Sequence, residues 1–451
     1  MPLILGANTL SAGGYEVDNS CRFNRDSSDY LSRTPASSGN RRTWTFSTWV
    51  KRSSLTGNQD LITSGSALQV VSYIYFYTAN GIFAFEEYTG GYQINIKSNA
   101  YLRDLSAWYN LIIAVDTTQG TASNRIKMYI NGNQVTSLSA TTYPSQNFEC
   151  NINSNTLHNI GCEQNGTNCI DGYLAETVFI DGLQLGEDSF GEFDEDSGIW
   201  KPIDVSGLTF GTNGFYLEFK DSSALGDDTS GTGNDWTVNN LTSIDQTTDT
   251  PTNNFATLNP LLDVNAVGTY SEGNLVFTGT GSTNFGGCSI PVSNGKWFCE
   301  VKMTVNGSYP ILGVIDAQSY KRRDGTYFVG SDINANNPSG FAVFSNGNIY
   351  HNNSSSYGAL GTTYTTGNIL GMALDMDSGT KTLGFYKNGT LETTINLDEP
   401  PSGAYMFATS IHSSASSGKT EWNFGNPPFT ITTGNADAND YGNFEYEVPA
   451  G

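Results

Sequence analysis

Residues 367–389, GNILGMALDMDSGTKTLGFYKNG, predict two antiparallel strands joined by a tight turn. Every second residue from Leu370 to Met376 is apolar, and the residues between them are small or acidic. This alternation is typical of a strand that buries one face. The return strand ends at Asn388-Gly389, a pair that type I′ hairpin turns favour because both central residues need positive φ.

A second stretch, NLIIAVDTTQGTASNRIKMYINGNQV at 110–135, repeats this order of features. An apolar strand ends in an acidic residue, a turn containing glycine follows, and the return strand ends at Asn131-Gly132. The two Asn-Gly turns lie more than half the chain apart, whereas solenoid repeats recur every ~20–50 residues. We therefore expect two sandwiches in series, although any β-meander also repeats hairpins.

The composition favours an all-β protein. The chain has 451 residues, which is enough for two or three domains that each bury a core. It contains 50 Gly, 24 Tyr and 24 Phe, and only 14% of its residues are charged, which suits short strands joined by many turns. No convincing amphipathic helix pattern is present.

The net charge of −23 argues against nucleic acid as a partner, because the phosphates of nucleic acids bind to basic patches on proteins. It also argues against docking on an anionic membrane, and it keeps the protein soluble. No run of ~18 apolar residues exists, so we expect no membrane insertion. Residues 1–10 lack the basic start and the apolar length of a signal peptide, so we expect no export by the usual secretory route.

The cysteine pattern does not predict a metal site. The six cysteines form no C-x-x-C pair and only three histidines exist, so a structural zinc site is not expected. Cys162 and Cys169 flank a hairpin-like loop and could form a disulfide, but the sequence leaves their pairing open. Cys299 lies in an apolar strand and is predicted to be a small core residue.

Two ordered sets of motifs carry family resemblances. F-x-x-W-V-K at 46–51, A-W-Y-N-L at 107–111, M-Y-I-N-G at 128–132 and D-G-Y-L-A-E at 171–176 together resemble a laminin-G-like, concanavalin A-like sandwich. G-K-W-F-C-E-V at 295–301, I-L-G-V at 311–314 and the hairpin at 367–389 resemble a SPRY domain, which is also a bent two-sheet sandwich. The resemblances imply two concanavalin A-like antiparallel β-sandwiches in tandem.

These resemblances divide the chain into five parts. The expected parts are an N-terminal arm at 1–20, a laminin-G-like sandwich at 21–200, a Gly/Asp/Ser/Thr-rich joint at 201–260, a SPRY-like sandwich at 261–430 and a C-terminal tail at 431–451. The joint is expected to lend a strand to one of its neighbours.

The tandem and the joint between its members resemble virion appendage or tail-fibre proteins of marine tailed bacteriophages. This resemblance implies a protein exposed on the particle surface after synthesis in the host cytoplasm. Its expected partners are other virion proteins, further copies of itself as a homo-oligomer, and a glycan or protein of the host surface.

No motif predicts catalysis. Residues 192–196, EFDED, place acids two apart, but they lie between glycines without the apolar strand that a sandwich glycosidase needs, so we interpret them as a solvated loop. The three histidines lie in no triad pattern, and no G-x-S-x-G, H-E-x-x-H or P-loop motif occurs. We expect no cofactor; calcium at Asp-rich loop tips stays open, because no ligand spacing supports it.

Aromatic residues in polar loops are the best binding signal. Tyrosine rings beside amide and guanidinium donors suit sugar faces and peptide edges. The predicted ligand-binding residues are Tyr320, Arg322, Arg323, Tyr327, Tyr350, His351 and Tyr357. The predicted virion anchor is the apolar set Leu3, Ile4, Leu5 and Leu10, which is too small to form a core of its own.

Three functional hypotheses follow from the sequence. The first is a non-enzymatic virion protein that presents lectin-like sandwiches to the host surface. The second is a purely structural virion protein, such as a capsid decoration or a tail connector. The third is a polysaccharide depolymerase.

Overall fold

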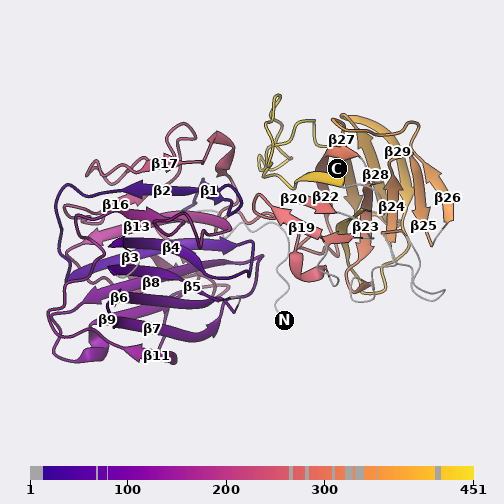
Figure 1. Ribbon diagram of the computed structural model, residues 1–451. Helices are drawn as coiled ribbons and strands as arrows, with labels where there is room; N and C mark the ends of the chain where they lie inside the picture. Colours follow the sequence, from indigo (N-terminus) through magenta and orange to yellow (C-terminus); the bar gives the residue numbers. More distant parts are fainter. Residues whose placement is uncertain are drawn as a thin grey trace. The chain divides into compact units, whose positions relative to one another are not determined.

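The protein is an all-β molecule, as predicted. The computed structural model describes residues 14–67, 70–78, 80–263, 268–279, 284–306, 310–319, 329–330, 340–352, 354–411 and 418–450. The chain divides between Asn254 and Phe255 into an N-terminal unit and a C-terminal unit (Figure 1). No helix within these described ranges is long and apolar enough to cross a membrane.

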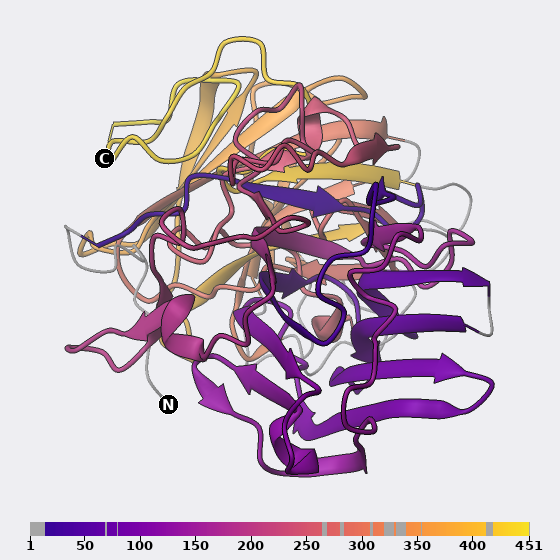
Figure 2. The same ribbon diagram turned by 90° about the vertical axis from the view of Figure 1, so that its left-hand side faces the viewer.

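The N-terminal unit is a sandwich of two antiparallel sheets (Figures 1 and 2). Sheet A has the described order β10 (Asn133–Gln134), β9 (Ile126–Ile130), β8 (Trp108–Asp116), β3 (Thr43–Arg52), β13 (Gly172–Asp181), β1 (Ser20–Phe23) and β18 (Gln246–Thr247), with β16 (Phe215–Leu217) also paired to β13. Sheet B has the described order β11 (Leu138–Thr142), β7 (Tyr92–Tyr101), β6 (Ile82–Thr89), β5 (Val70–Tyr77), β4 (Gln59–Ala67), β12 (His158–Ile160), β2 (Tyr30–Arg33) and β17 (Thr237–Asn239).

The inner faces of the two sheets form the core of the N-terminal unit. Trp44 of sheet A meets Phe85 of sheet B edge to face, with ring centroids 5.6 Å apart. The outer face of sheet A is covered as well, because the hairpin of β14 (Gly191–Phe193) and β15 (Trp200–Pro202) places Trp200 in a cluster with Trp49 and Trp108. The described residues of this unit also include the short 3-10 helices η1 (Ala122–Asn124), η2 (Glu187–Ser189) and η3 (Ser243–Asp245).

Residues 201–254, expected as part of a joint, belong to the N-terminal unit. Three of its strands pair within the sandwich: β16 with β13, β17 with β2, and β18 with β1. Trp236 and Leu241 from this stretch enter the core, which explains why a polar sequence still folds with its neighbour. This stretch therefore contributes three strands to the N-terminal unit, whereas a single strand was expected.

The C-terminal unit is a second two-sheet sandwich. Its first described sheet has the order β19 (Gly268–Ser271), β20 (Val276–Gly279), β31 (Gly418–Asn423), β22 (Lys296–Asn306), β27 (Ile369–Asp375), β28 (Thr382–Lys387) and β29 (Thr390–Asn396). Its second has the order β21 (Asn284–Gly287), β30 (Tyr405–Ile411), β23 (Pro310–Asp316), β24 (Gly340–Phe344), β25 (Asn348–His351) and β26 (Ser354–Ala359). The 3-10 helix η4 (Pro260–Leu262) precedes them.

Both Asn-Gly hairpins are confirmed. β27 pairs with β28 as predicted, and Asn388 and Gly389 form the turn between β28 and β29, with φ angles of 47° and 80°. Asn131 and Gly132, in the corresponding hairpin of the N-terminal unit, have φ angles of 47° and 71°. Cys299, predicted as a core residue, is fully buried in the C-terminal core.

The C-terminal tail packs against its own unit. The carboxylate of Glu300 accepts hydrogen bonds from the backbone N–H groups of Glu445 and Tyr446, each at 2.9 Å. Because Glu300 is fully buried in β22, these bonds attach the tail to the first sheet.

Candidate functional site

The outer face of sheet B carries a row of aromatic side chains. In β5, Tyr73, Tyr75 and Tyr77 alternate with Ile74 and Phe76, which point into the core. Side chains of a strand alternate between its two faces, so the three tyrosines share the outer face. We call this row, together with Tyr88 of β6 and Tyr92 of β7, the tyrosine face.

The rings of the tyrosine face touch one another and a lysine. The ring centroids of Tyr73 and Tyr75 are 6.0 Å apart, and those of Tyr75 and Tyr77 are 6.1 Å apart. Lys97 of β7 places its ammonium 3.5 Å from the ring centroid of Tyr77. Tyr92 is 53% exposed, whereas Tyr75 is only 4% exposed, so Tyr92 is open to solvent and Tyr75 is covered by its neighbours.

Carboxylates border these rings. Glu86 forms an ion pair with Lys97 at 2.7 Å, and Glu163 accepts a hydrogen bond from the hydroxyl of Tyr73 at 2.8 Å. Asp60 lies opposite Tyr75 across β4 and β5, and burial, with a contribution from the Glu163 carboxylate, raises its pKa well above the usual range. Aromatic faces beside hydrogen-bonding groups can stack on the apolar face of a sugar and bind its hydroxyls.

A disulfide loop holds Glu163 beside the tyrosine face. Cys162 and Cys169 form a disulfide, so the pairing that the sequence left open is present in the structure. Within the loop, Thr167 and Asn168 donate hydrogen bonds to Glu163 at 3.0 Å each. These bonds fix the carboxylate toward Tyr73.

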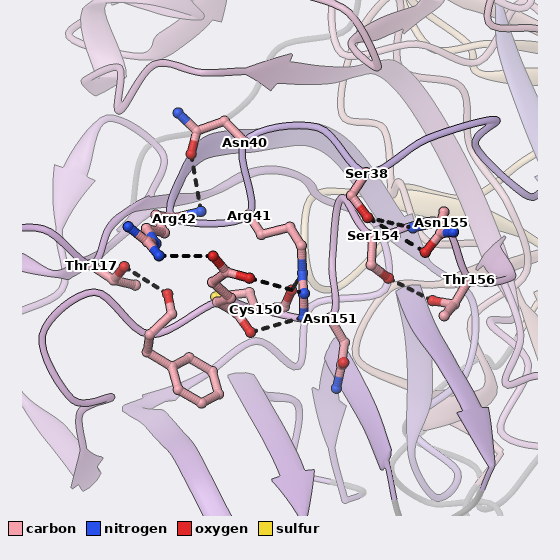
Figure 3. A network of polar contacts seen from close by, with 12 residues as sticks. Ser38, Asn40, Arg41, Arg42, Thr117, Cys150, Asn151, Ser154, Asn155 and Thr156 are labelled. Carbon is pink, nitrogen blue, oxygen red and sulfur yellow. Dashed lines mark hydrogen bonds and ion pairs between the residues drawn. The ribbon is translucent and has the colours of Figure 1, made fainter.

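The loops at one end of the N-terminal sandwich form a second polar network (Figure 3). Arg41 and Arg42 both pair with the Glu149 carboxylate, at 3.3 and 2.8 Å. Thr117 donates a hydrogen bond to the carbonyl of Phe148 at 2.7 Å. These contacts join residues 40–42, 117 and 148–156, so the network mainly holds the loops together.

His158 lies beneath this loop network and is buried. Its Nδ1 donates to the carbonyl of Thr156 at 2.8 Å, and its Nε2 accepts from the backbone N–H of Asn153 at 3.1 Å. Burial lowers its pKa to about 4, so the ring is neutral near pH 7. It also lines a small pocket with core side chains such as Phe215 and Trp236. We assign His158 a structural role.

The acidic run 192–196 is a capped turn. Asp194 accepts hydrogen bonds from the backbone N–H and the hydroxyl of Ser197, which lower its pKa. Lys201 pairs with Glu192 at 3.2 Å and with Asp194 at 3.4 Å. Glu192 and Asp194 are therefore engaged within the β14–β15 hairpin, whereas Glu195 and Asp196 are exposed.

Most of the predicted site residues lie outside the described residues. These are Tyr320, Arg322, Arg323 and Tyr327 of the binding loop, and Leu3, Ile4, Leu5 and Leu10 of the anchor.

The three other predicted binding residues do not share one surface. Tyr350 and His351 are neighbours in β25, so they point to opposite faces of the sheet. Tyr350 packs on Phe344, with ring centroids 4.1 Å apart. His351 is buried and stacks on Phe341 at 3.9 Å.

Tyr357 and Asp398 complete the His351 cluster. The ring centroids of His351 and Tyr357 are 5.0 Å apart, and Tyr357 donates to the carbonyl of Asn396 at 2.8 Å. His351 Nε2 lies 3.2 Å from the carboxylate of Asp398, whose side chain is 61% exposed. The cluster connects the edge of one sheet to the loop after β29.

The described residues contain no group of three or more His, Cys, Asp or Glu side chains placed to hold a metal ion. Calcium therefore has no ligand set among the described residues.

Residues 25–183 match the sequence model of the concanavalin A-like lectin/glucanases superfamily, of the laminin-G type. This region has a concanavalin A-like lectin fold. No curated protein has a significantly similar sequence.

Three solved structures illustrate what the chain is similar to. The SPRY domain of human HERC1 is 19% identical, with 37% of this chain and 96% of that chain covered and a TM-score of 0.28. A heptameric SAP-like pentraxin from Limulus polyphemus is 13% identical, with 38% and 80% covered and a TM-score of 0.29. A proposed carbohydrate-binding protein from Bacteroides ovatus is 15% identical, with 50% and 59% covered and a TM-score of 0.35.

Sequence reasoning missed the tyrosine face, although its signal is present. The segment 72–77 reads SYIYFY, in which tyrosine occupies every second position. A strand with this pattern places its tyrosines together on one face. What the sequence does not show is that the neighbouring strands supply Lys97 and Glu86 to the same face.

Proposed function

We propose that this protein is a non-enzymatic, glycan-binding component of a tailed bacteriophage particle. The tyrosine face is the observation that carries the proposal, because it combines aromatic rings with hydrogen-bonding groups on the outer face of a sheet. The match of residues 25–183 to a lectin and glucanase superfamily supports a carbohydrate ligand.

The charge favours a neutral glycan. The chain has a net charge of −23. Beside the tyrosine face lie two carboxylates, those of Glu86 and Glu163, and one ammonium group, that of Lys97. A sulfated or uronate-rich polysaccharide would be repelled by this field, most strongly at low ionic strength. A neutral polysaccharide would not be repelled by these charges.

The described carboxyl groups near the tyrosine face favour binding over hydrolysis. A glycosidase needs two carboxyl groups that face the scissile bond. Here Asp60 is 1% exposed, Glu86 is paired with Lys97, and Glu163 accepts hydrogen bonds from its own loop. Each of these groups is buried or already engaged.

The virion assignment rests on the resemblance of the tandem to marine phage appendage proteins. In this proposal the apolar N-terminal residues anchor the chain to other virion proteins, and copies of the chain assemble as a homo-oligomer on the particle surface. Antibody labelling of intact particles, imaged by electron microscopy, tests this location. Absence of the protein from purified particles would refute it.

A binding measurement with variants tests the glycan site. Tyr73→Ala and Tyr77→Ala each remove one half-buried ring, and we expect each to weaken binding of a neutral host polysaccharide about two- to tenfold. Tyr357→Ala is the matched control, because it removes a partly exposed tyrosine from the C-terminal unit.

The opposite pattern would locate the ligand on the C-terminal unit instead. If the parent protein binds no neutral host polysaccharide, the glycan-binding function itself is wrong. Release of reducing ends from the polysaccharide would show a depolymerase.

A further inference from the structure

Lys51, Asp249 and Asn254 form a polar triad on the outer face of sheet A, in which Lys51 and Asp249 are buried and Asn254 is partly buried. The Nζ atom of Lys51 lies 2.7 Å from Oδ2 of Asp249 and 2.8 Å from Oδ1 of Asn254. The side chains of Lys51 and Asp249 are 1% and 0% exposed. A buried primary amine and a buried carboxyl group therefore meet a partly buried carboxamide.

Aromatic and backbone groups hold the triad in one arrangement. Trp108 donates from Nε1 to Oδ1 of Asp249 at 3.0 Å, and Lys51 lies 5.7 Å from the ring centroid of Tyr173. Asn254 donates from Nδ2 to the carbonyl of Ser106 at 2.9 Å. The carboxamide of Asn254 is therefore held at both its oxygen and its nitrogen, with its oxygen in contact with the amine of Lys51.

Asp249 is placed to accept a proton from Lys51, because its Oδ2 atom lies 2.7 Å from Nζ. A neutral, desolvated lysine amine is a nucleophile. Fixing a nucleophile beside its target replaces a slow bimolecular encounter with an intramolecular step.

We propose that Lys51 and Asn254 are joined by an intramolecular isopeptide bond that the folded chain forms by itself. The lone pair of Lys51 Nζ attacks Cγ of Asn254, so an Nζ–Cγ bond forms and the Cγ–Nδ2 bond breaks. Asp249 takes a proton from Nζ and delivers it to Nδ2, which leaves as ammonia. The step needs no oxidant, metal or cofactor, because amine plus carboxamide gives substituted amide plus ammonia.

The bond would tie the end of the N-terminal unit to the middle of sheet A. Lys51 and Asn254 are 203 residues apart in sequence, and Asn254 is the last residue of its unit. Tension applied beyond residue 254 would pass directly to β3, which lies between β8 and β13. Without the bond, the same tension would first reach β18, a two-residue strand at the sheet edge.

Mass spectrometry of the full-length protein tests the bond. We expect the intact mass to be lower than the sequence mass by one ammonia. Trypsin cannot cleave after an acylated lysine, so peptide 43–52 should remain joined to peptide 221–296. An unmodified mass with normal cleavage after Lys51 would overturn the proposal. Loss of water instead would make Asp249 the acyl donor, and would overturn the assignment to Asn254.

Variants test the role of each group. Lys51→Met and Asn254→Ala should both abolish the mass loss, whereas Asn253→Ala, which changes the adjacent amide, should keep it. Asp249→Asn should not form the bond, because the substitution removes the group that carries the proton. A cross-link at the parental level in this variant would overturn the mechanism. If a variant fails to fold, the digest of the parent protein still decides whether the bond exists.

Discussion

Glu176 is a buried carboxyl group at an irregular point of β13. Its φ angle is 48°, and the pairing of β13 with β3 shifts register between Ala175 and Val178. It accepts hydrogen bonds from the hydroxyls of Tyr216 at 2.6 Å and Tyr15 at 3.1 Å. Burial outweighs these bonds and raises its pKa to about 7 from an ordinary value of 4.5.

The raised pKa of Glu176 predicts a pH-dependent stability. The folded state binds the proton more tightly than the unfolded chain does, so the contribution to the free energy of unfolding is complete below pH 4.5 and is lost as pH rises through 7. The full loss would be at most ~3 kcal/mol. Glu176→Gln stays neutral, so its stability relative to the parent should increase between pH 5 and pH 8 in urea denaturation.

A matched control separates Glu176 from other acids. Burial also raises the pKa of Glu87 to about 7, so the parent keeps part of the same pH dependence when Glu176 is replaced. The exposed Glu195 serves as the control, and Glu195→Gln should leave the pH profile unchanged. If Glu176→Gln behaves like Glu195→Gln, the carboxyl of Glu176 is hydrated in solution and the assignment of its pKa is wrong.

At the scale of elements, the Cys162–Cys169 disulfide loop connects stability to ligand binding. The loop lies beside β4, where Asp60 forms an isolated bridge with Cys169, and it carries Glu163 to Tyr73. Closing a loop this short restricts the unfolded chain and stabilises the fold by about 2–3 kcal/mol. The same closure keeps Glu163 in place for a ligand on the tyrosine face.

Reduction of this disulfide should therefore have two effects. We expect a reductant to lower the free energy of unfolding by ~2–3 kcal/mol and to weaken polysaccharide binding. Chemical denaturation and binding assays with and without the reductant provide the measurement. The Cys162→Ser, Cys169→Ser double variant should behave like the reduced parent and should not respond to reductant. A parent protein that keeps its stability when reduced would show that the loop is held by its hydrogen bonds.

At the scale of the whole molecule, the two units should fold independently when the chain is cut where the structure divides. We expect fragments 1–254 and 255–451 each to show β-type circular dichroism and a cooperative thermal transition. A fragment that stops at residue 220 should lose cooperativity, because it lacks β17, β18 and the core residue Trp236. Equal stability of fragments 1–220 and 1–254 would show that residues 221–254 add little to the sandwich.

The sequence by itself determined the fold class and the hairpins. The alternation of apolar with small or acidic residues in 367–389 predicts strands, because successive side chains in a strand point to opposite faces. Asn131-Gly132 and Asn388-Gly389 set turns because both residues accept positive φ. These are local effects of backbone sterics and hydrophobic period, so they are visible within a few residues of chain.

Tertiary structure alone decided which distant residues meet. Polar residues 201–260 were predicted as a joint, because nothing local shows that Trp236 enters a core. Tyr350 and His351 were predicted as one site. Their neighbouring positions in β25 instead place the two side chains on opposite faces of the sheet, and His351 is buried. The Lys51–Asp249–Asn254 triad joins β3 to the end of the unit across about 200 residues, and only the packing of sheet A brings its three groups within hydrogen-bonding distance.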